Sequence, residues 1–239
     1  MARPDIHLYT ASTMNGWKPT IFLEEAGVDY ELTFIDFARK EQKADWYVAL
    51  NPNGRIPTIV DRGNEDFTVF ESGAILWYLA EKYGVFLSED PKLRSETLQW
   101  LMFQMGGVGP MMGQAMYFQR IAAPNGQEEP FSIKRYVEES RRLLEVLDRR
   151  LQGRDFLVGE AFSIADIATY PWARAFPWAK VSIDGLEHLK VWFDRIDARP
   201  AVQRALEKPK AVPAFWGQAD EAAFLAENAA RFAGDVKAS

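Results

Sequence analysis

The chain has 239 residues, of which 48% are hydrophobic and 26% charged, so it is long enough to bury one large core or two smaller ones. Its formal net charge of -6 argues against nucleic acid or an anionic membrane as the main partner, because both favour basic patches. We find no leader, no lipidation motif and no apolar stretch of the roughly 18 residues that a membrane span needs, so we expect a cytoplasmic protein. The absence of cysteine and the wide separation of His7 and His188 argue against a metal site and against a thiol nucleophile of the protein's own.

Residues 6–36 predict a strand, a helix and a second strand. The run 6–10 is rich in β-forming residues, a turn follows at 13–16, and apolar residues recur at helical spacing over 17–26. Gly27 suits the end of that helix, and 30–36 alternates with the period of two that is typical of a strand. The unit has the length expected for a parallel strand pair. A short helix around Trp46 and Tyr47 then leads to the next turn.

The segment 51–61 predicts a binding edge. Asn-Pro-Asn-Gly at 51–54 is a dense turn signal, and Pro57 opens a short β-branched strand over 58–61. A proline at this position leaves the peptide groups of Ile56 available to an extended ligand. After a second strand at 67–70, Glu71 and Ser72 begin an amphipathic helix over 72–83, whose first turn offers unpaired N-H groups to a carboxylate. Taken alone, these residues are also common turn punctuation and an ordinary helix cap.

From residue 94 onward the pattern predicts helices, at 94–118, 131–151, 164–178 and 186–198. The run 106–110, rich in glycine and ending in proline, predicts either a bent helix over a cleft or a break between two helices. Ser163 and Asp166 form a capping-box pattern, to which we give a structural role. An alanine-rich helical stretch at 220–232 belongs to a tail that we expect to pack back on the body.

A set of short motifs runs through both halves of the chain. They are Thr13-Met14-Asn15-Gly16-Trp17-Lys18, Leu23-Glu24-Glu25, the segments 51–57, 70–79 and 99–114, and Lys134-Arg135-Tyr136. Together they resemble the glutathione transferase superfamily over residues 6–206, and most closely its bacterial nu class. The resemblance implies an α/β plus all-α fold: a thioredoxin-like glutathione-binding domain at 1–87, a linker at 88–93, and an all-helical glutathione transferase C-terminal domain with a tail at 94–239.

The same resemblance implies which residues hold glutathione. Thr13 and Asn15 would meet its sulfur and stabilise the thiolate, as the catalytic pair. The binding residues would be Gln42, Arg55, Ile56, Pro57, Glu71, Ser72 and, from the neighbouring subunit of a homodimer, Arg135. In this arrangement Pro57 would be cis, the backbone of Ile56 would pair with the cysteinyl unit, and Glu71 with Ser72 would hold the γ-glutamyl end.

Two further side chains near the first loop, Tyr9 and Ser12, stay open as the thiol-activating group, because other transferase classes use Tyr, Ser or Cys. The candidates to line an apolar pocket for a second substrate are Met105, Met111, Met112, Tyr117, Phe118 and Trp178. Most of them are expected in the core, and Met112 and Phe118 are the two that we favour.

The resemblance implies a glutathione-dependent disulfide-bond oxidoreductase or glutathione transferase, acting on small-molecule or peptide disulfides, with peroxidase or conjugating activity as a further option. Because the chain has no cysteine, both reacting thiols would come from glutathione. The alternative is a non-catalytic binding or scaffold protein that keeps the glutathione transferase fold.

Overall fold

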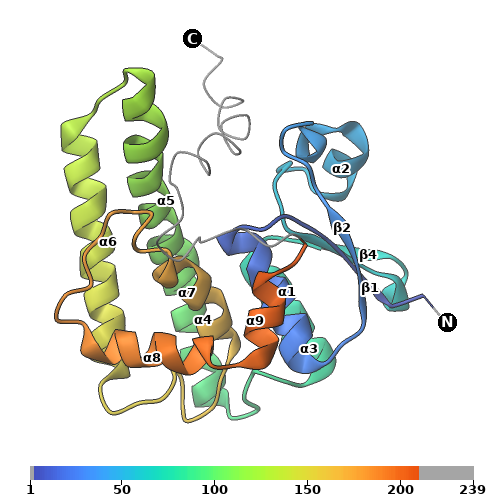
Figure 1. The fold of residues 1–239 in the computed structure, drawn as a ribbon. Coiled ribbons are helices and arrows are strands. Elements are labelled where there is room, and N and C mark those ends of the chain that lie inside the picture. The colour runs from blue at the N-terminus through green and yellow to red at the C-terminus, as the bar shows by residue number, and fades with distance from the viewer. Residues whose placement is uncertain (1–2, 210–239) are drawn as a thin grey trace.

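The computed structural model describes residues 3–209, and its first part is a thioredoxin-like domain built on a four-stranded mixed sheet (Figure 1). The strands are β1 (Ile6–Thr10), β2 (Tyr30–Phe34), β3 (Thr58–Asp61) and β4 (Phe67–Phe70), in the order β2-β1-β3-β4. β1 and β2 are parallel, whereas β3 is antiparallel to both β1 and β4. The predicted βαβ unit and hairpin are confirmed, with β2 ending two residues earlier than the alternation suggested.

Helices α1 (Met14–Ala26) and α3 (Ser72–Tyr83) form a layer between the sheet and the second domain (Figure 1). α1 ends as predicted at Gly27, which adopts a left-handed φ of 64° and donates its N-H to the carbonyl of Glu24. It begins three residues before the predicted start, because Thr13 caps it. Gly16 is required there: a Cβ would lie 2.0 Å from the carbonyl oxygen of Ala11, the residue that follows β1.

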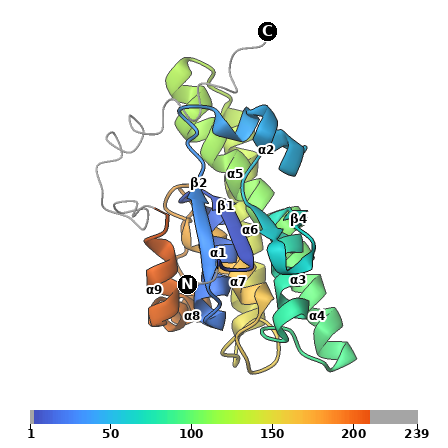
Figure 2. The same ribbon diagram turned by 90° about the vertical axis from the view of Figure 1, so that its right-hand side faces the viewer.

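The second domain is all-helical, as predicted. Its helices are α4 (Pro91–Phe103), α5 (Gly109–Tyr117), α6 (Pro130–Leu151), α7 (Ile164–Arg174), α8 (Glu187–Asp197) and α9 (Pro200–Leu206). Three short helices belong to the first domain: η1 (Glu41–Lys43), α2 (Asp45–Leu50) and η2 (Arg62–Asn64). A fourth, η5 (Ala123–Asn125), lies between α5 and α6. Figure 2 looks onto the sheet, with α5 and α6 behind it and α9 at its side.

The glycine-rich run at 106–110 does not interrupt the helix. α4 continues into α5 through a π-helical turn, η3 (Gln104–Val108), and a second π-turn, η4 (Phe118–Ala122), follows α5. In the first turn the N-H of Gly109 reaches the carbonyl of Gln104, one residue further back than in an α-helix. The predicted window 94–118 is therefore one helical path with an altered turn in it, and the prediction of a break is wrong.

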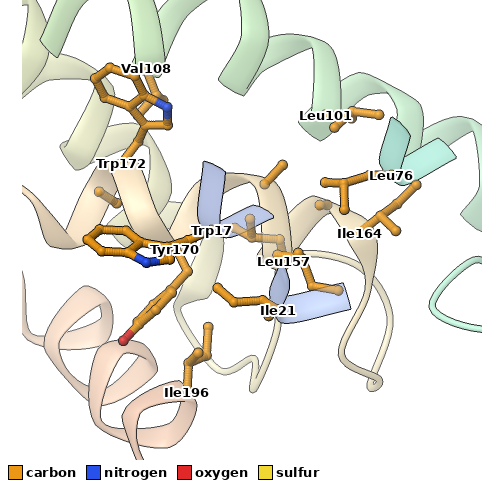
Figure 3. Packing of buried hydrophobic residues seen from close by; sticks show 14 of the residues in the cluster. Trp17, Ile21, Leu76, Leu101, Val108, Leu157, Ile164, Tyr170, Trp172 and Ile196 are labelled. Carbon is orange, nitrogen blue, oxygen red and sulfur yellow. The ribbon is translucent and has the colours of Figure 1, made fainter. Parts of the chain in front are cut away.

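One hydrophobic core joins the two domains. Trp17 and Ile21 of α1 pack with Leu76 of α3 and with Ile164 and Trp172 of α7, as Figure 3 shows. α7 is buried along nearly its whole length, and its predicted capping box is present between Ser163 and Asp166. The carboxylate of Asp166 also accepts hydrogen bonds from the N-H of Leu157 and the indole of Trp192, so its role is structural.

Two sequence predictions concern the ends of the second domain. α3 ends at Tyr83 and α4 begins at Pro91, inside the expected linker 88–93, so the position of the domain boundary stays a prediction. The predicted helix at 220–232 and the packing of the tail lie outside the described residues. Within 3–209, no helix has the length and the apolarity that crossing a membrane requires.

Candidate functional site

A pocket of about 640 Å³ opens where the start of α1 and the start of α3 meet the π-turn η3 and α5. Its lining contains two cationic side chains, one carboxylate, several amides and two aromatic rings. The lining residues are Asn15, Lys18, Arg55, Glu71, Gln104, Met105, Gly109, Pro110, Gly113, Gln114, Tyr117 and Trp172. Three of the predicted site residues, Asn15, Arg55 and Glu71, are thus brought to one cavity.

Asn15 is held by a tryptophan from the other domain. The indole Nε1 of Trp172 donates to Asn15 Oδ1 at 2.8 Å. An indole N-H can only donate, so this bond fixes the side-chain oxygen of Asn15 on Trp172. The N-H groups of the same amide are left to donate to another group. The ring of Trp172 fits over two glycines of α5: a Cβ at Gly113 would lie 3.4 Å from the ring, and one at Gly109 3.5 Å from it.

Thr13 is the N-cap of α1, and its Oγ1 accepts the N-H of Gly16 at 3.1 Å. It is 5% exposed and stands immediately before the helix whose first turn carries Asn15. Because a hydroxyl donates one hydrogen bond while accepting others, the cap leaves the Thr13 O-H able to donate. The residue therefore has the structural role that its position suggested and keeps one donor.

Lys18 lies one turn after Asn15 on α1 and is fully buried. Its Nζ donates to Ser72 Oγ at 3.1 Å, to Gln104 Oε1 at 2.7 Å and to Met105 Sδ at 3.4 Å. Burial lowers the pKa of this ammonium to about 7, against an opposing effect of the nearby Glu71 carboxylate. The side chain thus joins the first turn of α3 to the π-turn of the second domain.

Glu71 and Ser72 stand at the start of α3, as predicted. Glu71 is the N-cap and has a φ of 70°, which is uncommon for a residue with a side chain and is often found at functional sites. Its carboxylate lines the pocket and accepts a hydrogen bond from Asn53 Nδ2 at 3.4 Å. Ser72 is 3% exposed, and the N-H groups of this first turn lack helical partners, which favours an anion there.

The predicted binding edge is fixed by Asn51, which is 2% exposed. Its Nδ2 donates to the carbonyl of Arg55 at 2.6 Å and to Thr58 Oγ1 at 3.0 Å, and the hydroxyl of Tyr47 reaches the same carbonyl at 2.9 Å. The peptide bond between Ile56 and Pro57 is cis, as predicted. The ladders of β3 with its neighbours begin at Thr58, so the peptide groups of Ile56 lie beyond them.

Several predicted residues lie away from the pocket. Gln42 is in η1, where its side-chain Oε1 is buried without a partner among the described residues, and Arg135 is on an exposed face of α6. Tyr9 packs its ring against His7 with centroids 4.1 Å apart, and burial raises its pKa. Ser12 lies between β1 and α1.

The two favoured pocket residues were wrong choices. Met112 is fully buried in the core, and Phe118 stacks on Tyr136, so neither lines the cavity. Met105 and Tyr117, which were also among the candidates, do line the cavity, with a thioether and an aromatic ring. Adjacent residues of an α-helix point in different directions. Which side chains of α5 face the pocket therefore depends on the π-turn at 104–108, which changes the helical phase ahead of α5.

Sequence reasoning gave no role to three residues that build the site, Lys18, Gln104 and Trp172. Lys18 carried a signal, because it is a charged residue within the otherwise apolar core of α1 and three positions after Asn15. Gln104 falls in the segment 99–114, to which the sequence pattern assigns no catalytic or binding role. Trp172 is 157 positions from its partner Asn15, a pairing that only the tertiary fold creates.

A thioredoxin-like domain followed by an all-helical domain, with an open polar pocket between them, defines the class of two-domain thioredoxin-fold proteins. Residues 4–81 match the glutathione S-transferase N-terminal domain, and residues 110–200 match the glutathione S-transferase C-terminal domain. The disulfide-bond oxidoreductase YfcG of Escherichia coli is 46% identical over 207 residues, which cover 85% of this chain and 95% of that protein. The chain therefore belongs to the glutathione S-transferase family.

Two solved structures agree with this assignment. A glutathione transferase from Pseudomonas putida, with one glutathione disulfide bound per subunit, is 43% identical at a TM-score of 0.80, covering 86% of this chain and 92% of that one. A glutathione transferase from Burkholderia graminis, with two glutathione molecules bound per subunit, is 41% identical at a TM-score of 0.81, covering 87% and 90%.

Proposed function

We propose that this protein is a glutathione-dependent disulfide-bond oxidoreductase of the nu class, which binds glutathione in the pocket at the domain junction. The observation that carries the proposal is that Asn15, Arg55 and Glu71, three of the predicted glutathione contacts, line one cavity. The relatives named above support it, since one is a disulfide-bond oxidoreductase and two hold glutathione or its disulfide. Peroxidase or conjugating activity, and a location in the cytoplasm, belong to the same proposal.

In the proposed pose, the γ-glutamyl end of glutathione lies at the start of α3. The Glu71 carboxylate would accept its ammonium group, while Ser72 and the N-H groups of the first helical turn would hold its carboxylate. The backbone of Ile56, presented by Pro57, would pair with the cysteinyl unit as an added strand does. Arg55 would meet the glycyl carboxylate, and Gln42 and a partner's Arg135 would complete the site.

The sulfur would lie against Thr13 and Asn15. A thiol with a pKa near 8.5 is mostly protonated at neutral pH, and the thiolate is the attacking species. The Asn15 amide, whose carbonyl is bound to Trp172, and the Thr13 hydroxyl, whose oxygen caps α1, each have a donor left for an anion. Lowering the thiol pKa by one to two units requires only about 1.4 to 2.7 kcal/mol, which two hydrogen bonds to a charged group supply.

The proposed reaction is thiol–disulfide exchange. The bound glutathione thiolate attacks one sulfur of the substrate disulfide, and the other sulfur leaves as a thiolate that takes up a proton. A second glutathione then attacks the mixed disulfide and releases the second substrate thiol, so that two glutathione molecules are oxidised to one glutathione disulfide. The chain contains no cysteine, so both attacking sulfurs come from glutathione.

The test measures reduction of a small-molecule disulfide by glutathione with Asn15→Ala, Thr13→Ala and Thr13→Ser. We expect Asn15→Ala and Thr13→Ala each to lower kcat at least about tenfold, because each removes a hydrogen bond to a charged partner worth about 1.5 to 3 kcal/mol. Thr13→Ser keeps both the cap and the donor and should stay near wild type. The matched control Asn64→Ala should do so too, because the Asn64 amide donates to the Tyr78 hydroxyl and neither residue lines the pocket.

Each contrary outcome has a specific meaning. Turnover near the wild-type level in both alanine variants would transfer the activating role to Ser12 or Tyr9. Binding of glutathione by the wild-type protein without any turnover would favour the scaffold alternative.

A further inference from the structure

The ammonium group of Lys18 lines the pocket but has no role in the reaction proposed above. It is fully buried, and its three hydrogen-bond partners in the described chain are neutral: a hydroxyl, an amide oxygen and a thioether. An ammonium group withdrawn from water without a paired anion is unfavourable by several kcal/mol, so such groups are rare in cores. A core position of α1 would be more stable with an apolar residue.

The charges that face Lys18 come from several elements. Glu71, at the start of α3, acts on it most directly and opposes the effect of burial. The other charged or titratable groups of the same pocket are Arg55 and Tyr117, while η3 contributes the neutral Gln104 and Met105. At the far end of α1, the carboxylates are already paired, Glu25 with Arg199 and Glu24 with Arg204 and Lys208.

The hydrogen bonds of Lys18 fix the orientation of a hydroxyl. When Lys18 is charged, its ammonium group has three N-H donors and no acceptor, so Ser72 Oγ must then accept from it. The O-H of Ser72 is then free to turn toward another acceptor, and its contact with Met105 Sδ is a distant one, at 3.8 Å. Ser72 is in this way prepared as a donor at the start of α3, where an anion is also favoured by the helix.

We propose that Lys18 is a positioning residue for the γ-glutamyl carboxylate of glutathione: in its charged form it holds Ser72 as a donor to that carboxylate, and where it is neutral before binding it takes up a proton from solvent when the carboxylate binds. The inference rests on the proposed function, because it needs glutathione in this pocket. The bound carboxylate, one hydroxyl away from Nζ, adds a counter-charge to that of Glu71, and it thereby favours the charged form of the lysine.

A pKa of about 7 for Lys18 in the free protein makes this coupling measurable. At pH 8 most molecules would have a neutral Lys18 before binding and a charged one after it, whereas at pH 6 the lysine is charged in both states. Binding should therefore take up between about half a proton and one proton per site at pH 8, and close to none from this group at pH 6.

The experiment is calorimetric titration with S-methylglutathione, which has no titratable thiol, in two buffers of different ionisation enthalpy at pH 6 and pH 8. The variants are Lys18→Met, which keeps the length of the side chain but not its charge, and the matched control Lys190→Met, at a lysine paired with Glu187 on the surface. We expect proton uptake at pH 8 in wild type and in the control, its loss in Lys18→Met, and a fall in affinity of tenfold or more in that variant.

A second measurement uses the wild-type protein alone. In lysine-labelled protein, one side-chain resonance should titrate near pH 7 without ligand and above pH 9 with S-methylglutathione. Failure of the wild type to bind would defeat the proposed function itself. Binding without proton uptake, without a lysine that titrates near pH 7, or with uptake retained in Lys18→Met would overturn the role of Lys18 and leave the proposed function standing.

Discussion

At the scale of single residues, Lys18 makes the stability of the fold depend on pH. Its pKa is about 7 in the folded protein and about 10.4 in an unfolded chain. Between these values the unfolded chain binds a proton that the folded chain does not, so stability must rise with pH. Below pH 7 both states are protonated, and the full cost of burying the charge is present.

We predict that the free energy of unfolding of the wild-type protein gains up to about 1.4 kcal/mol per pH unit between pH 7 and 9, relative to Lys18→Met. Urea titrations of both proteins and of Lys190→Met at several pH values measure this difference. Burial raises the pKa of Asp166 to about 6 and lowers that of His7 below its usual 6.5, so both groups change charge below the chosen window. Parallel curves for wild type and Lys18→Met would contradict the prediction.

A site residue can be predicted from the sequence when its role depends on neighbours a few positions away along the chain. Glu71 and Ser72 were predictable because a helix start is encoded within a few positions, and Thr13 is recognisable as a cap for the same reason. The bond between Trp172 and Asn15, and that between Lys18 and Gln104, join residues 157 and 86 positions apart. No local pattern records such pairs, and they complete the pocket.

At the scale of elements, the π-turn at 104–108 determines which side chains reach the pocket. It brings Gln104 and Met105 toward α1 and α3, where a Cβ at Gly73 would lie only 3.0 Å from Met105. Two glycines of this region differ sharply in their surroundings. A Cβ at Gly109 would lie 2.7 Å from Gln104 Nε2, whereas one at Gly106 would meet nothing within 4 Å.

These two glycines give a matched pair of substitutions. Gly106→Ala should raise the free energy of unfolding by about 0.4 to 1 kcal/mol, since alanine restricts the unfolded chain and favours helical backbone. Gly109→Ala should forfeit that gain, displace the Gln104 amide from Lys18, and weaken glutathione binding several-fold. Thermal unfolding and titration with glutathione separate the two effects. Equal affinity in both variants would mean that the Gln104 amide does not support the site.

The elements whose apolar residues follow a single strand or helix period were predicted well. Those in which the period changes were not. The strands and α3 follow plain alternation or helical spacing, and their predicted bounds agree with the structure to within two residues. α9 was not predicted, although Pro200 stands in its first turn, where a proline is favoured. The π-turn could not be predicted, since one extra residue in a helical turn leaves no compositional signature beyond the glycines that permit it.

At the scale of the whole molecule, the apolar surface supports a second copy of the chain as partner. Leu98 and Met102 are one turn apart on α4 and 39% and 55% exposed, and Phe70 of β4 is 38% exposed. On α6, Phe131 is 78% exposed, and Arg135 follows it one turn later on the same face. Exposed apolar side chains mark an interface where they form one continuous patch, and Leu98 and Met102, one turn apart on α4, are neighbours of the kind that such a patch contains. We propose a homodimer that covers them.

The same assembly would give Arg135 its task, because it lies outside the pocket of its own chain and its guanidinium suits a carboxylate of the tripeptide. Arg135→Ala should weaken binding of glutathione disulfide about tenfold or more, by loss of a charged hydrogen bond, while the sedimentation profile stays that of the dimer. Lys134→Ala is the matched control, since it removes a neighbouring exposed charge that pairs with Glu138 on its own helix. A monomer at micromolar concentration that reduces disulfides at the full rate would defeat the shared site. Equal losses of affinity in both variants would instead reduce the role of Arg135 to a general attraction of anions, which added salt would screen.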